Sequence, residues 1–202
     1  MKTVTYSDVL NLAAELAGRA DDTTTGGLRL TPSEAILLRT LFASELPDLW
    51  ESEAWPELCD HVEAVTLDSD SCFSLREGAA DEMGSVLALV ASGDPRVTTI
   101  VTVLPRERWT RLDDRVNVVG PVSGSLYVDW QTPCPDLMDD AVVAPALADY
   151  ELPVRFKLPL AARGAALLLA EEDPVRAATL RALAAQAMMN QASRLTRPWW
   201  RR

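Results

Sequence analysis

The middle of the chain, residues 81–137, constrains the fold most. It holds four short runs rich in β-branched and aromatic residues, separated by glycine, proline and aspartate, at 86–92, 97–103, 115–119 and 125–131. Such runs, bounded by turn-forming residues, are typical of strands. Helical spacing of apolar residues precedes and follows the stretch. The sequence therefore predicts an α+β fold, in which helices from both ends of the chain form a helical layer and a small antiparallel β-domain is inserted between them.

The N-terminal arm shows clear helix signals. Ser7 is the expected N-cap of a first helix over 7–19. In a second helix, Thr31 caps the start, Pro32 occupies the first helical position and Glu34 completes a capping box. Pro47 is expected to end or kink this helix, because proline has no N–H for the helical hydrogen bond.

Aromatic residues follow that proline. Trp50 and Trp55 are interpreted as core anchors near the end of the helix, with ligand stacking as the alternative. Two weaker strands are expected at 61–67 and 71–75, where apolar and polar residues alternate imperfectly.

Two further helices are expected in the C-terminal arm. Residues 156–170 are apolar nearly all round, which predicts a buried helix beginning at Pro159. Asp173 and Pro174 match the N-cap and first position of another helix, over 174–195. The expected organisation is a helical arm at 1–58, a β-domain at 59–138 and a second helical arm at 139–202 that packs with the first.

Composition narrows the class of protein. The 202 residues are 48% hydrophobic, enough for a core, yet no apolar run approaches the roughly 18 residues of a membrane span. The N-terminus does not resemble a signal peptide, so a cytoplasmic or virion protein is expected. Cys59, Cys72 and Cys134 are widely spaced and odd in number, which favours small buried thiols in a reducing environment.

The net charge of −11 is unevenly distributed. Residues 1–60 carry 4 basic and 11 acidic groups, residues 61–150 carry 6 and 15, and residues 151–202 carry 9 and 4. An acidic body argues against a broad nucleic-acid surface. Two interpretations stay open: the basic C-terminal arm docks an acidic partner, or the excess of acidic groups simply keeps the protein soluble.

No catalytic or metal site is predicted. His61 is the single histidine, and His61-Val62-Glu63 lacks the P-C-x-x-C that a zinc deaminase needs. Asp68-Ser69-Asp70 resembles the start of a calcium loop, but Cys72 stands where an oxygen ligand belongs, so a solvated turn is favoured. Acid pairs at 113–114 and 139–140 do not by themselves indicate glycosidase chemistry. The sequence predicts a protein that is not an enzyme and binds no cofactor.

Several short motifs, in order, carry a resemblance. They are Trp55-Pro56-Glu57, the turn Asp94-Pro95-Arg96, the run GSLYVDW at 124–130 before Pro133 and Pro135, and LPVRFKLPLAARGAALLLA at 152–170. Together they resemble head–tail connector proteins of tailed bacteriophages, most closely the adaptor (gatekeeper or tubular tail protein-like) that lies under the portal. The acidic segment at 136–153 has no counterpart in that pattern.

The resemblance implies a structural virion protein of the neck, made in the host cytoplasm. Its partners would be the portal protein, a downstream tail or neck protein and copies of itself in a ring, generally dodecameric. DNA would only pass through the channel that the ring extends, and no membrane is involved. In related connectors a C-terminal segment often inserts into the portal, and this role falls on Arg197, Trp199, Trp200, Arg201 and Arg202. Trp and Arg dominate interface hot spots, which supports docking, although the two rings could instead fold back on the helices.

Two other functions remain open from the sequence. A cellular α+β protein-interaction module would use the same C-terminus for a protein partner without any virion. An unrecognised hydrolase would need a pocket around His61.

Overall fold

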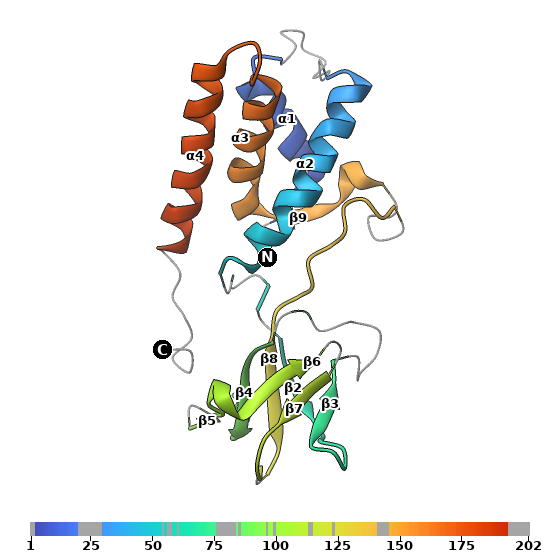
Figure 1. Cartoon of the computed structure of the whole chain (residues 1–202), viewed down its shortest axis with the longest axis vertical. Helices are drawn as coiled ribbons and strands as arrows, with labels where there is room; N and C mark the ends of the chain where they lie inside the picture. Colours follow the sequence, from blue (N-terminus) through green and yellow to red (C-terminus); the bar gives the residue numbers. More distant parts are fainter. Residues whose placement is uncertain are drawn as a thin grey trace. The chain divides into compact units, whose positions relative to one another are not determined.

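The chain forms two compact units in the computed structural model (Figure 1). The helical unit comprises Met1–Glu53 and Pro135–Leu195, and the β unit comprises Ala54–Cys134. The predicted α+β class, with helices from both ends and an inserted antiparallel β-domain, is confirmed. The structure describes residues 3–19, 30–53, 55, 58–59, 61–75, 84, 86–95, 97–98, 100–112, 115–122, 124–140 and 146–193, with the side chain of His61 left out.

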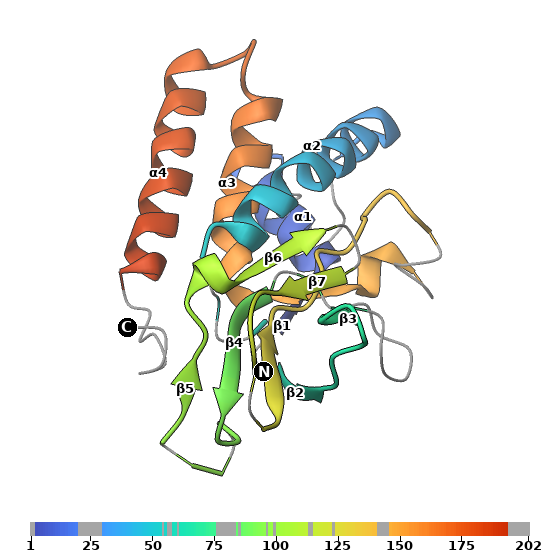
Figure 2. The ribbon, with the colours of Figure 1, turned by 60° about the horizontal axis from the view of Figure 1, so that its bottom comes forward.

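Helix α3 is the centre of the helical unit. It packs against α1, α2 and α4, and both views place it between α2 and α4 (Figures 1 and 2). The helical elements are α1 (Tyr6–Leu16), α2 (Pro32–Glu51), α3 (Lys157–Leu168) and α4 (Pro174–Ala192), with 3-10 turns η2 (Leu147–Asp149) and η3 (Val154–Phe156) before α3.

Close packing around α3 depends on small side chains. Its alanines at 161, 162, 165 and 166 are fully buried, as the apolar run at 156–170 predicted. A Cβ atom on Gly164 would lie 3.0 Å from the side chains of Leu38 and Phe42 in α2. Glycine therefore sets how closely α2 approaches α3.

A two-stranded pair joins the N-terminal segment to the segment that precedes α3. Strand β1 (Thr3–Thr5) runs antiparallel to β9 (Glu151–Pro153), with Val4 opposite Leu152. The Tyr6 N–H also donates to the carbonyl oxygen of Tyr150 at 2.8 Å. These strands have no sequence signal, because each is three residues long and its partner lies far away in the sequence.

Helix boundaries differ from the expected ones in four places. Helix α1 begins one residue earlier, because Thr5 and not Ser7 is the N-cap: the Thr5 hydroxyl accepts from the Asp8 N–H, and the Asp8 carboxylate accepts from the Thr5 N–H. Helix α1 ends at Leu16, helix α3 begins at Lys157 after η3 instead of at Pro159, and α4 ends at Ala192. The predicted capping box of Thr31 and Glu34 is confirmed.

Pro47 does not end α2, which continues to Glu51. The proline ring is exposed, while Leu46, Leu49 and Trp50 are buried. Burial of these apolar residues outweighs one missing backbone hydrogen bond. Trp50 contacts Phe156, with ring centroids 5.7 Å apart, so its interpretation as a core residue is confirmed; Trp55 is fully buried as well.

The β unit contains two antiparallel sheets that share one apolar core, which includes Phe73, Leu89, Val116 and Val128. The four-stranded sheet has the order β2-β8-β4-β5 and the three-stranded sheet the order β3-β7-β6. Their strands are β2 (His61–Val65), β3 (Cys72–Ser74), β4 (Val86–Ser92), β5 (Thr102–Val103), β6 (Trp109–Leu112), β7 (Arg115–Val118) and β8 (Leu126–Trp130).

The prediction of a strand at 97–103 is mostly wrong. Of the run at 97–103 only Thr102 and Val103 pair with β4, and Val97 and Ile100 are 84% and 85% exposed. The connection between β4 and β5 turns closely, since Gly93 has φ +77 and its Cβ would lie 2.3 Å from the carbonyl oxygen of Ile100. Strand β6 was not foreseen, and the strands expected at 61–67, 71–75, 115–119 and 125–131 are shorter than predicted.

Enlarging Gly164 tests the packing of α2 on α3. Gly164→Val should lower the free energy of unfolding by about 1–3 kcal/mol, because the new methyl groups meet Leu38 and Phe42. Glu15→Val on the exposed side of α1 is the control, with a cost below about 1 kcal/mol. Urea denaturation measures both, and equal losses would contradict the role given to Gly164.

The capping boxes predict a pH dependence. Hydrogen bonds from the Thr5 and Thr31 backbone lower the pKa of Asp8 and of Glu34. Groups with a lowered folded pKa stabilise the fold above their unfolded pKa of about 4, and this contribution is lost as pH falls through the folded pKa. Thermal unfolding of Asp8→Asn with Glu34→Gln should therefore show a smaller loss of stability than the parent below about pH 4. Parallel pH profiles would contradict this.

Candidate functional site

The C-terminal residues predicted to dock the portal lie outside the described residues. These are Arg197, Trp199, Trp200, Arg201 and Arg202. His61 is placed only by its backbone, which pairs in β2 with Trp130 of β8. A site at the C-terminus therefore stays a prediction.

The three cysteines are free and half-buried, so the expectation of buried thiols is only partly met. The Cys59 thiol donates to Oε1 of Gln131 at 3.8 Å. Within the described part of the chain, no three His, Cys, Asp or Glu residues come together as a metal site would require. In the same residues, no helix has the length and apolar character needed to cross a bilayer.

The calcium-like motif forms a turn. The Asp68 carboxylate accepts from the N–H of Asp70 at 2.9 Å and of Cys72 at 2.8 Å, and it pairs with Arg115. The hydrogen bond from Cys72 is the main reason that the pKa of Asp68 is lowered. Its oxygens thus serve the turn between β2 and β3, as the sequence favoured.

The acid pair at 139–140 also has a structural contact. The Arg39 guanidinium donates to the Leu137 carbonyl oxygen at 2.7 Å and to Asp140 at 2.7 Å. This links α2 to the segment that returns the chain from the β unit. The pair at 113–114 lies outside the described residues.

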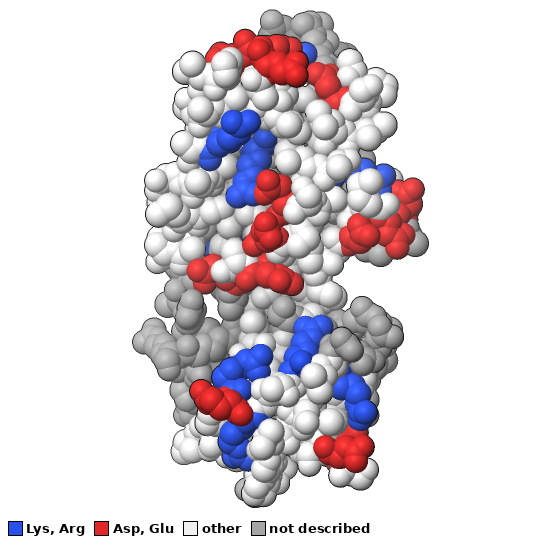
Figure 3. Space-filling view, in the orientation of Figure 1, with Lys and Arg blue, Asp and Glu red and all other residues white. Residues whose placement is uncertain are grey.

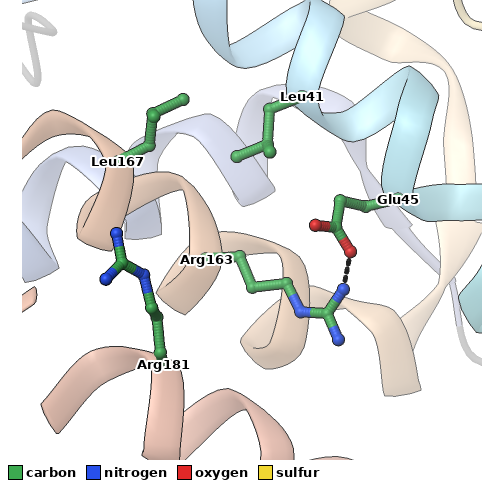
Figure 4. Close-up of a pocket in the computed structure, with 5 residues that line it drawn as sticks. All are labelled: Leu41, Glu45, Arg163, Leu167 and Arg181. Carbon is green, nitrogen blue, oxygen red and sulfur yellow. Dashed lines mark ion pairs between the residues drawn. The ribbon is translucent and has the colours of Figure 1, made fainter. Parts of the chain in front are cut away.

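The helical unit contains a pocket of about 320 Å³ between α2, α3 and α4 (Figure 4). Leu41 and Leu167 provide apolar walls, and Glu45 and Arg163 point toward one another across it. Arg181 reaches in from α4.

The two arginines of this pocket differ in their contacts. Arg163 forms an ion pair with Glu45, and burial lowers the pKa of Arg163. Arg181 has neither a hydrogen bond nor an ion pair with any residue that the structure describes. The arrangement can hold a carboxylate at Arg181 beside an apolar group. Glu45 is held by Arg163, which makes it a poor general base.

On the face of the helical unit in Figure 3, basic side chains gather beside a strip of acidic ones.

The pocket was not foreseen from the sequence. One signal was available, because Arg163 is the only charged residue between 158 and 170, an otherwise apolar stretch. A lone cation there needs a partner, but only the packing of α2 identifies that partner as Glu45.

Comparisons with protein-family models, with curated proteins and with solved structures find no match to this chain.

A double-mutant cycle tests the pairing in the pocket. Glu45→Gln and Arg163→Met should show a coupling of about 0.5–1 kcal/mol that decreases with salt, since both side chains are still about 30% exposed. Glu45→Gln with Arg181→Met is the control cycle and should show none. Denaturation of the four variants of each cycle measures the coupling. Equal coupling in the two cycles would contradict the assignment of the pair.

Proposed function

We propose that this chain is a structural subunit of the head–tail connector of a tailed bacteriophage. In this proposal it forms a ring beneath the portal, extends the DNA channel and joins the head to the tail. The observation that carries the proposal is the order of the two units: both ends of the chain build one helical unit, and the middle builds an antiparallel β unit. The motifs quoted above also follow one another along the sequence in the order that the resemblance implies.

The contacts between the N-terminal and C-terminal segments of the helical unit support a structural role. Strands β1 and β9 pair, α1 packs on α3, and Arg176 of α4 donates to the Leu16 carbonyl oxygen at 2.6 Å. The helical unit is thus closed by contacts between segments about 150 residues apart. A subunit clamped between two assemblies benefits from such closure, because local opening would release a neighbour.

The charge distribution is also compatible with this role. DNA moves easily past a surface that does not neutralise its phosphates, and the chain carries a net charge of −11. The excess of basic groups at 151–202 would face an acidic partner. Under the proposal that partner is the portal, the contact residues are those at 197 and 199–202, and the role is not enzymatic.

Peptide mass spectrometry of purified particles from the source tests the function. Peptides of this chain at a level comparable to the portal protein would support the connector. Clean particles without the chain would contradict it and leave a cellular interaction module as the better account.

Removing the C-terminal docking residues gives a further prediction. A chain lacking residues 197–202 should lose at least tenfold in affinity for the portal, because hot-spot Trp and Arg side chains each contribute about 2 kcal/mol or more. Co-sedimentation with purified portal measures this, and circular dichroism checks the fold. Trp199→Ala with Trp200→Ala, compared with Arg201→Ala with Arg202→Ala, separates the aromatic from the charged contribution. Unchanged attachment of the truncated chain would contradict the docking role.

A further inference from the structure

Exposed apolar side chains of the helical unit concentrate on its two outer helices. Among the described residues of α1–α4, every large hydrophobic residue that is exposed lies on α2 or α4. Ile36 and Leu37 of α2 are 65% and 46% exposed, and Val175 and Met189 of α4 are 77% and 66% exposed. The central helix α3 and helix α1 show none. The two helices that flank α3 thus carry an apolar surface that the unit itself does not use.

Helix α4 has two apolar sides. One side packs on α3 through Ala177, Leu180, Ala184 and Ala187, which are buried. The opposite side repeats the spacing of three and four residues and is exposed, with Val175, Ala178, Ala182, Ala185 and Met189. We name these five residues the outer seam of α4. A helix on the surface of a monomer needs one apolar stripe, so a second stripe at coiled-coil spacing indicates a second helix as its partner.

Helix α2 also has an exposed side, opposite the one that packs in the core. Ile36, Leu37, Thr40, Asp48 and Glu51 are exposed on the side away from the buried Leu38, Phe42 and Leu46. We name these five exposed residues the outer edge of α2.

The charges of the two surfaces are opposite. Between 174 and 192 the only charged residues are Arg176 and Arg181, both basic. On α2 the other charged groups are engaged within the unit, Glu34 by Thr31 and Arg19, Arg39 by Asp140 and Glu45 by Arg163. Asp48 and Glu51 have no ion pair with the described part of the chain.

The positions of the two surfaces indicate how copies meet. Because α2 and α4 flank α3, an outer seam of one copy can meet an outer edge of the next (Figures 1 and 2). A two-fold contact between the α4 helices of two copies would bring the two Arg181 side chains close together. A two-fold contact between the α2 helices would bring together four carboxylates, those of Asp48 and Glu51 in both copies. Like charges across a contact are unfavourable, so the head-to-tail arrangement is preferred.

We propose that the outer seam of α4 binds the outer edge of α2 in a second copy of this chain, with Arg181 facing Asp48 and Glu51. The contact is heterologous, so it repeats from copy to copy. Closure of that repeat into a ring rests on the proposed connector function; the contact itself does not.

Disulfide trapping tests the contact. In a background with serine at 59, 72 and 134, Ser44→Cys with Ala182→Cys in one chain should give an oxidation ladder of dimers, trimers and larger species, because Ser44 is exposed one helical turn before Asp48. Neither single-cysteine variant should cross-link alone, whereas a mixture of the two should give dimers. Ser44→Cys with Asn190→Cys is the matched control, because Asn190 is exposed on another side of α4. Circular dichroism checks that each variant folds.

Charge reversal tests the partners within the contact. Arg181→Glu should lower the yield of the ladder about tenfold, which corresponds to about 1.4 kcal/mol. Asp48→Lys with Glu51→Lys should do the same, and all three reversals in one chain should restore the ladder.

Three results would overturn the contact: dimers from Ala182→Cys alone, a control ladder as strong as the main one, or no restoration by the combined reversals. The contact and the proposed function can be contradicted independently of one another. Particles that contain the chain but show no link between positions 44 and 182 would contradict the contact alone. A ladder in solution with particles that lack the chain would contradict the connector function alone.

Discussion

The close approach of α2 and α3 is the constraint on which the helical unit depends. Gly164 leaves no room for a β-carbon beside Leu38 and Phe42, and alanines line the rest of α3. With its helices so near, the unit buries Leu38, Phe42 and Leu160 completely. The same arrangement brings Glu45 to Arg163 and forms the pocket that Arg181 enters. A larger side chain at 164 would disturb the core and the pocket together.

The central position of α3 also determines what remains exposed. Because α3 is covered by α1, α2 and α4, its own apolar residues need no further partner. Helices α2 and α4 are each covered on one side only, which leaves the outer edge and the outer seam accessible. The proposed head-to-tail contact follows from this asymmetry, since a unit with two complementary sides can repeat.

Local signals with a strong physical basis were predicted well. The capping box of Thr31 and Glu34, the start of α4 at Pro174 and the strand at 86–92 are set by neighbouring residues, and the structure has them where expected. Features that depend on distant residues were missed. Strands β1 and β9 exist only as partners of one another, and Thr5 rather than Ser7 caps α1 at the end of that strand pair. The pocket joins residues 41, 45, 163, 167 and 181 from three helices, which no local pattern could bring together.

The sequence alone determined the class of fold, because the period of its apolar residues changes from helical to strand-like and back along the chain. It also determined the acidic body and the basic C-terminal arm, since charge is a property of composition. Only the tertiary structure decided that α2 continues past Pro47, because burial of Leu49 and Trp50 outweighs one lost hydrogen bond. It likewise decided which apolar residues stay exposed. Val175 and Leu180 are similar in a sequence, but the packing of α3 covers only the second.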